Sequence, residues 1–254
     1  MENIININNT NNENEYKLCS LLFDTFTPDY ESNLQTLLGL IDKTSKKSII
    51  VAPELCLTGF DYKNFDEVQK FADIANEAIK KASQEKIIIF TMIDKLDGEV
   101  FNFVKVFHNG EIIHQRAKSR LFRFGDEHKY MSEGSDDSIE IVEVDGIKIG
   151  ILICFELRFK NLWQKLESSD IIAIPSWWGV LRTEHFVTLT ESLAIMNQCY
   201  VVTSDSLNDK CSKMSGIITP QGKAQRNGNK PCLEVQYSKK EISVMRKYLN
   251  VGIK

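Results

Sequence analysis

The sequence has few of the features that would place it in a specialised class. No apolar run approaches the roughly 20 residues that a membrane helix needs, so we expect no membrane span and no membrane partner. Proline is scarce, with five in 254 residues, and no linker rich in Pro, Gly or Ser divides the chain. Its six cysteines, at positions 19, 56, 154, 199, 211 and 232, include no CxxC pair, which argues against a metal site.

An excess of positive charge is also missing. The formal net charge is −4 and the pI is about 5.7, which argues against a nucleic-acid partner. Residues 1–15 are rich in asparagine and have no apolar core of the kind that a signal peptide needs, so we interpret them as a disordered lead-in. We therefore expect a cytoplasmic protein with reduced thiols.

The remaining composition is that of a globular protein. Apolar residues make up 43% of the chain and charged residues 26%, both ordinary values. A chain of 254 residues can bury a sizeable core as one large domain. Because there is neither an internal repeat nor a linker, we predict a single domain over residues 16–254.

Apolar spacing predicts helices that alternate with strands. We expect strands at 17–23, 48–52, 86–92, 170–175 and 200–203, and helices at 29–44, 66–82, 159–167, 182–197 and 238–248. Hairpins interrupt this alternation, because predicted strands flank Asn109-Gly110, Asp145-Gly146 and the Gly-rich segment 220–228. The pattern indicates either one mixed sheet or two packed sheets, with helices outside.

Three side chains with reactive or charged groups each stand at the end of a predicted strand. Cys154 ends the run 147–153, Glu54 follows Pro53 at the end of another strand, and Lys118 follows a hairpin strand. Taken singly, each has an ordinary interpretation, as a buried thiol, an exposed loop acid or a solvated lysine. Together they supply a nucleophile, a base and a positive group at strand ends, where α/β folds keep their chemistry.

Two other classes are considered. A papain-like Cys–His enzyme needs a histidine, and the chain has only His108, His114, His128 and His185. Of these, only His128, beside Glu127, has a suitable context. A non-catalytic binding protein is the second alternative, and the presence of all three residue types argues against it.

Five stretches carry a family resemblance. They are PELCLTGF (53–60), KSRLFRFGDEHKYMSEG (118–134), GILICFELRF (150–159), DIIAIPSWWG (170–179) and NQCYVVTSD (197–205). In order and spacing they resemble the nitrilase superfamily of carbon–nitrogen hydrolases. The resemblance implies a four-layer α-β-β-α sandwich, a homodimer, a small-molecule amide substrate and no cofactor. It also implies a catalytic triad of Glu54, Lys118 and Cys154, with Glu127 as a second glutamate near the site.

The implied chemistry is coherent. Glu54 would take the proton of the Cys154 thiol as the sulfur attacks an amide carbon. Lys118 and the backbone N–H of Phe155 would stabilise the oxyanion. Protonated Glu54 would then donate to the departing amine and later activate water against the thioester.

The segment from Cys154 to Phe159 is closest to the ω-amidase and deaminated-glutathione-amidase branch, in which Cys-Tyr-Asp-x-Arg-Phe is common. In that branch the arginine corresponding to Arg158 binds a substrate carboxylate. The alternative is a structural bond from Arg158 to Glu156 or to the backbone. Trp177 and Trp178 follow a strand and would either wall the pocket or pack in the core.

The chain also departs from that branch. Phe155 and Glu156 replace the usual Tyr and Asp, Lys160-Asn161 replaces Pro-Glu, and the helix segment 190–197 lacks the usual arginines and acid. These departures leave the exact substrate open. An N-carbamoyl amide hydrolase and an aliphatic amidase of the same superfamily are the alternatives.

Overall fold

Two six-stranded β-sheets form the centre of the protein in the computed structural model, which describes residues 16–253. The lead-in predicted for residues 1–15 lies outside the described residues. The first sheet has the order β12-β1-β2-β3-β4-β5, and the second has the order β11-β10-β9-β8-β7-β6. In each sheet three central strands are parallel and the outer strands are antiparallel, so both sheets are mixed.

The strands of the first sheet are β1 (Lys17–Leu21), β2 (Ser48–Val51), β3 (Ile87–Leu96), β4 (Glu99–His108), β5 (Glu111–Ala117) and β12 (Cys232–Gln236). Those of the second sheet are β6 (Val142–Val144), β7 (Ile147–Ile151), β8 (Ile171–Pro175), β9 (Tyr200–Ser204), β10 (Gly216–Ile218) and β11 (Ala224–Arg226). The α-helices are α1 (Tyr30–Lys43), α2 (Phe65–Ala82), α3 (Lys160–Lys165), α4 (Thr183–Asn197) and α5 (Lys239–Tyr248).

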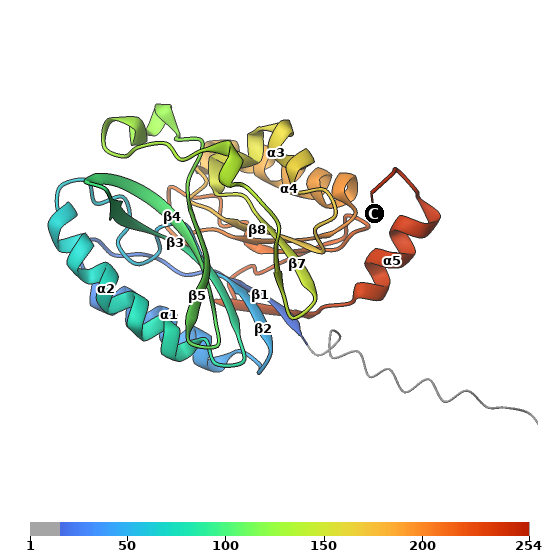
Figure 1. The fold of residues 1–254 in the computed structure, drawn as a ribbon, viewed down its shortest axis with the longest axis horizontal. Helices are drawn as coiled ribbons and strands as arrows, with labels where there is room; N and C mark the ends of the chain where they lie inside the picture. Colours follow the sequence, from blue (N-terminus) through green and yellow to red (C-terminus); the bar gives the residue numbers. More distant parts are fainter. Residues whose placement is uncertain (1–15, 254) are drawn as a thin grey trace, which may run out of the picture.

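Helices cover the outer face of each sheet. Figure 1 shows α1 and α2 beside the first sheet and α3 and α4 on the opposite side, beyond the second sheet. The predicted four-layer α-β-β-α sandwich is therefore confirmed. Of the two arrangements that the strand pattern left open, the structure has two packed sheets.

Alternation along the central strands explains this packing. Ile49 and Val51 of β2 belong to the core between the two sheets, whereas Ile50 belongs to the core beneath α1 and α2. Ile87, Ile88 and Ile89 divide in the same way on β3, as the period of two in a strand requires. Strands that are buried on both faces therefore read as continuous apolar runs.

Most predicted elements are present, with three differences. The strand predicted for 86–92 continues to Leu96 and turns at Asp97-Gly98 into β4. The predicted Gly-rich turn contains the short edge strand β11. The helix predicted for 159–167 spans only Lys160–Lys165, and a 3-10 turn at Cys154–Arg158 precedes it. The extension of β3 contains Asp94 and Lys95, and β11 is an edge strand in which two of the three residues are polar. Neither segment therefore has the continuous apolar pattern of a buried strand.

Within residues 16–253, no helix is both long enough and apolar enough to cross a lipid bilayer. All six cysteines are free thiols. The predicted start of the last helix is present as well, because the Ser238 side chain accepts a hydrogen bond from the Glu241 N–H.

Candidate active site

Strand ends of the two sheets meet at one place. Lys118 directly follows β5, Glu54 follows β2 by three residues, and Cys154 follows β7 by three residues. The N–H of Glu54 donates to the carbonyl of Ser176, just past β8, at 3.2 Å. This bond ties a strand end of the first sheet to a strand end of the second.

Lys118 lies at the centre of a buried charge cluster. Its Nζ donates to Glu54 Oε1 at 2.7 Å and to the two carboxylate oxygens of Glu127 at 2.9 and 3.0 Å. Burial alone would lower the pKa of Lys118, but the charges of Glu54 and Glu127 outweigh it and raise that pKa. Lys118 is therefore a fully buried ammonium with two anionic partners.

Glu54 has one bound and one unbound oxygen. Oε1 accepts from Lys118 and from Asn102 Nδ2, the latter at 2.8 Å, while Oε2 has no hydrogen-bond partner among the described residues. Burial raises the pKa of Glu54, and the charge of Lys118 opposes that rise. The nearby Cys154 thiol also favours the ionised carboxylate. Oε2 is thus a buried acceptor with capacity for a proton.

Cys154 begins the 3-10 turn with an unusual backbone. Its φ of 43° lies in the left-handed region, which residues other than glycine rarely adopt, and such strain is typical of functional sites. Burial and the negative charge of Glu54 raise the thiol's pKa, although Lys118 and the backbone N–H of Trp177 act to lower it. The resting thiol is therefore protonated, and it needs a base before it can act as a nucleophile.

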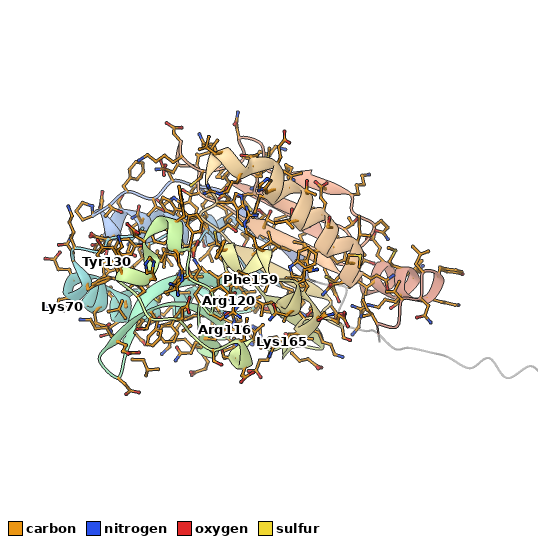
Figure 2. All side chains as sticks on the ribbon, turned by 90° about the horizontal axis from the view of Figure 1, so that it is seen from above. Lys70, Arg116, Arg120, Tyr130, Phe159 and Lys165 are labelled. Atoms are coloured by element: carbon orange, nitrogen blue, oxygen red, sulfur yellow. The ribbon has the colours of Figure 1, made fainter. Side chains whose placement is uncertain are left out.

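A buried ion pair holds this turn in place. Glu156 accepts from both terminal nitrogens of Arg116, at 2.9 and 2.7 Å, and from the backbone N–H groups of Ile153 and Ser119, each at 2.7 Å. Burial would raise the pKa of Glu156, but Arg116 and these N–H groups lower it. The pair joins the Cys154 turn to the segment that carries Lys118. Arg116 is buried, and Figure 2 labels it near Arg120.

We expect Glu156→Leu to destabilise the fold by about 3–5 kcal/mol, because it leaves the Arg116 guanidinium buried without its partner. Urea unfolding measures this loss, with the exposed strand residue Glu143 changed to Gln as the control. Arg116→Leu in the same background should restore part of the stability. A loss below about 1 kcal/mol, typical of an exposed pair, would contradict the assigned role.

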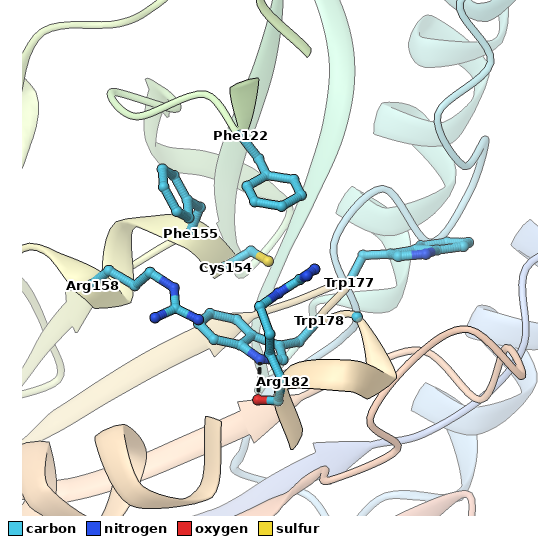
Figure 3. Close-up of a pocket in the computed structure, with 8 residues that line it drawn as sticks. Phe122, Cys154, Phe155, Arg158, Trp177, Trp178 and Arg182 are labelled. Atoms are coloured by element: carbon cyan, nitrogen blue, oxygen red, sulfur yellow. Dashed lines mark hydrogen bonds between the residues drawn. The ribbon is translucent and has the colours of Figure 1, made fainter. Parts of the chain in front are cut away.

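A small pocket opens onto the thiol. The residues that line it are Phe122, Cys154, Phe155, Arg158, Trp177, Trp178, Gly179 and Arg182. Figure 3 shows Phe122 and Phe155 on one side of the Cys154 sulfur and the tryptophans with Arg182 on the other. All four residues predicted to bind substrate, which are Phe155, Arg158, Trp177 and Trp178, lie in this lining.

The two tryptophans differ in their surroundings. Trp178 is buried, with its backbone N–H bonded to Asp205 Oδ1 at 2.9 Å and its Nε1 bonded to the carbonyl of Arg182 at 2.8 Å. Trp177 is half-buried and meets Phe60 edge to face, with 5.7 Å between ring centres. From the sequence, Trp178 would either wall the pocket or pack in the core. In the structure it does both.

Arg158 does not pair with Glu156, whose carboxylate is occupied by Arg116. Its guanidinium carbon lies 4.8 Å from the ring centre of Trp178, and one of its nitrogens is 3.1 Å from Nδ1 of His185. None of the four histidines has a hydrogen bond to Cys154 within residues 16–253, and His128 is exposed. The geometry therefore offers no support for a Cys–His enzyme.

Three residues of the site were not singled out in the sequence, namely Asn102, Arg116 and Arg182. Asn102 is an amide between Phe101 and Phe103 in the predicted strand Val100–His108, which is a signal of a buried polar role. Arg182 stands at the start of a predicted helix, where nothing in the sequence distinguishes it from a solvated residue. Its place in the pocket depends on how that helix packs.

A family model and individual relatives both match this chain. The family model described as carbon–nitrogen hydrolase matches residues 18–230. The chain is 29% identical over 228 residues to a 2-oxoglutaramate amidase of Bacillus subtilis, covering 85% of this chain and 87% of that protein. It is 25% identical over 209 residues to a deaminated glutathione amidase of Escherichia coli O157:H7, covering 77% and 80%.

Solved structures agree with the fold. A CN-hydrolase superfamily protein of Xanthomonas campestris superposes with a TM-score of 0.80 at 19% identity, covering 91% of this chain and 94% of that one. Nit3 of Saccharomyces cerevisiae, a member of branch 10 of the nitrilase superfamily, gives a TM-score of 0.79 at 18% identity, covering 94% and 96%. At these identities the likeness concerns the fold.

Proposed function

Because the chain belongs to the carbon–nitrogen hydrolase family, we propose that it is an amidase that uses Cys154 as its nucleophile and releases ammonia from a small amide bearing a carboxylate. One observation carries this proposal. The buried carboxylate of Glu54 has Oε1 held by Lys118 and Asn102, and it leaves Oε2 without a partner in the described structure, beside a protonated thiol.

The acylation step follows from this geometry. Glu54 accepts the thiol proton while the Cys154 sulfur attacks the amide carbon. Negative charge develops on the amide oxygen, where the Lys118 ammonium and the backbone N–H of Phe155 would stabilise it. The intermediate collapses when Glu54 returns the proton to the amine, which leaves as ammonia and yields a thioester on Cys154.

The deacylation step uses the same base. Glu54 takes a proton from water as the water oxygen attacks the thioester carbon, and the thiolate leaves with a proton from Glu54. The product is the free carboxylic acid. Glu127 binds the Lys118 ammonium through both oxygens, so we assign it the role of holding that cation in position.

Two observations favour a substrate that carries a carboxylate. Relatives at 25–29% identity include a 2-oxoglutaramate amidase, a deaminated glutathione amidase and an omega-amidase of Escherichia coli. Arg158 lines the pocket and has no ion pair with any described acidic residue. A guanidinium suits a carboxylate ligand because it donates two parallel hydrogen bonds. An N-carbamoyl amide hydrolase or an aliphatic amidase remains the alternative.

Ammonia release from a substrate panel tests the proposal. The panel contains succinamate, glutaramate, pentanamide, N-carbamoyl-β-alanine and propionitrile, and we expect the two monoamides of dicarboxylic acids to be turned over best. A preference for pentanamide would reject the carboxylate requirement, and a preference for the carbamoyl compound would favour the alternative. No release from any compound would favour a non-catalytic protein on this fold.

We expect Arg158→Ala to raise the KM for glutaramate by about tenfold or more, since a charge-assisted hydrogen bond of about 1.5–3 kcal/mol is lost. Pentanamide should change by less than about twofold in kcat/KM. Lys160→Ala is the matched control, because it removes an exposed positive charge two residues away. Equal losses on both amides would mark Arg158 as structural.

Three further proposals concern the extent of the domain, the oligomeric state and the location of the protein. We propose that the chain forms a single domain over residues 16–254, that it forms a homodimer, and that it works in the cytoplasm. Sedimentation equilibrium of the purified protein decides between monomer and dimer.

A further inference from the structure

We propose that Arg182 is a second specificity-determining residue and that its guanidinium and that of Arg158 bind the substrate carboxylate together. This inference rests on the amidase activity proposed above and extends it to the recognition of the acid end of the substrate.

The first step is the pairing of charges. Arg116, Arg120 and Arg226 each form an ion pair with a carboxylate, at Glu156, Asp136 and Glu191. Arg158 and Arg182, in contrast, have no ion pair with any acidic side chain in the described part of the chain. Both line the same small pocket. Two positive charges without a protein counterion therefore face the space beside the Cys154 thiol.

The second step is proximity. Arg158 and Arg182 line the same small pocket, and Figure 3 shows both side chains beside Trp178. Burial lowers the pKa of Arg158, and the positive charge of Arg182 lowers it further. Each remains charged, because arginine is not deprotonated in proteins. Like charges held close together in a partly buried site repel each other, and an anion between them relieves that repulsion. A carboxylate is the anion that a fork of guanidinium N–H groups fits best.

The third step is support for the Arg182 side chain. Its guanidinium carbon lies 5.1 Å from the ring centre of Phe122, and its carbonyl accepts from Trp178 Nε1. Figure 3 shows Arg182 extending toward Phe122, with the Cys154 sulfur pointing into the same space. Arg158 is placed in a similar way, over Trp178 and against His185. Both cations are thus positioned before substrate arrives, which lowers the entropic cost of binding.

The fourth step is the space beside Gly179. A Cβ atom at this position would lie 2.6 Å from a terminal nitrogen of Arg182 and 3.4 Å from its guanidinium carbon. The backbone of Gly179 has an ordinary φ of −60°, so a side chain would cause no backbone strain. The absence of a side chain at residue 179 is therefore what allows the guanidinium of Arg182 to occupy its place. Gly179→Ala offers a way to displace this group while keeping its charge.

The experiment compares glutaramate with pentanamide, two amides of equal chain length that differ in the terminal carboxylate. We expect Arg182→Ala to raise the KM for glutaramate about tenfold or more, with kcat/KM for pentanamide changed by less than about twofold. Arg182→Lys keeps the charge but loses the fork, so its loss should be intermediate. Gly179→Ala should also raise the KM for glutaramate selectively. Arg123→Ala, at an exposed residue next to Phe122, is the charge control and should match the wild type.

Calorimetry provides a readout that does not depend on turnover. With Cys154→Ala as the background, we expect glutaramate to bind at least about tenfold more weakly when Arg182 is also changed to Ala. If the wild type releases no ammonia but glutaramate binding still requires Arg182, the amidase proposal fails and the carboxylate site stands. Equal losses on both amides would mark Arg182 as a packing residue beneath Phe122, and an unchanged KM and affinity for glutaramate would show that it does not contact the carboxylate. Either result overturns the inference.

Discussion

Replacing Cys154 with alanine is expected to reduce ammonia release by about ten-thousand-fold or more, to the level of the assay background. The substitution removes the one atom that forms the covalent bond in the proposed reaction, so the remaining groups have no nucleophile to activate. Glu54 and Lys118 would keep their positions, since the bonds of Lys118 to Glu54 and Glu127 and of Asn102 to Glu54 remain.

The fold should survive this change. Alanine has the same backbone requirement as cysteine at a φ of 43°, and only one buried atom is lost. Thermal unfolding should stay within a few degrees of the wild type. Cys199→Ala is the matched control, because it removes a fully buried thiol far along the chain from the site and should leave the rate unchanged. Wild-type turnover by Cys154→Ala would show that another group attacks the substrate.

Replacing Glu54 with glutamine is expected to lower kcat/KM by about 100-fold or more, because a proton-transfer group is lost. The amide is nearly isosteric with the carboxylate, and its oxygen can still accept from Lys118 and Asn102. The change therefore removes the base while keeping most of the contacts. Glu99→Gln, at an exposed residue at the start of β4, is the control.

The pH profile gives a second test of the same residue. Burial raises the pKa of Glu54, and the ionised carboxylate that accepts the thiol proton is present only above that pKa. The rate of the wild type should thus fall with decreasing pH at a higher pH than an ordinary glutamate would produce, and Glu54→Gln should lack this fall. An unchanged acid limb in the variant would assign it to another group.

The combination of Glu54→Gln with Lys118→Ala should be less than additive. Lys118→Ala alone is expected to cost about 100-fold or more through loss of an oxyanion donor. Because both residues act on one tetrahedral intermediate, loss of the first removes most of what the second contributes. Fully additive losses would indicate that the two act in separate steps.

The strand-end positions of the candidate triad followed from the sequence because they depend on local features. The run before Cys154, the Pro53 that stops a strand before Glu54, and the hairpin strand before Lys118 each end an element within a few residues. The pattern of apolar residues also indicated where most helices and strands lie. Their layer arrangement came from a family resemblance that the structure bears out.

The contact partners of these residues could not be predicted from local features of the sequence. Asn102 contacts Glu54 from 48 residues away. Arg116 on β5 of the first sheet contacts Glu156, 40 residues away in the 3-10 turn that follows β7 of the second sheet. The sequence offered Arg158 as a possible structural partner for Glu156, because the two are near neighbours in the chain. Strand order and sheet packing decide which guanidinium reaches that carboxylate, and neither is a local property.

The sequence by itself determined which residue types stand at strand ends and hence the class of chemistry, because periodicity and turn signals act over a few residues. Only the tertiary structure decided what surrounds them. It left Glu54 Oε2 without a partner among the described residues and placed Arg182 in the pocket beside Arg158. These are outcomes of packing two sheets and their helices together, so they depend on contacts between residues far apart in the chain.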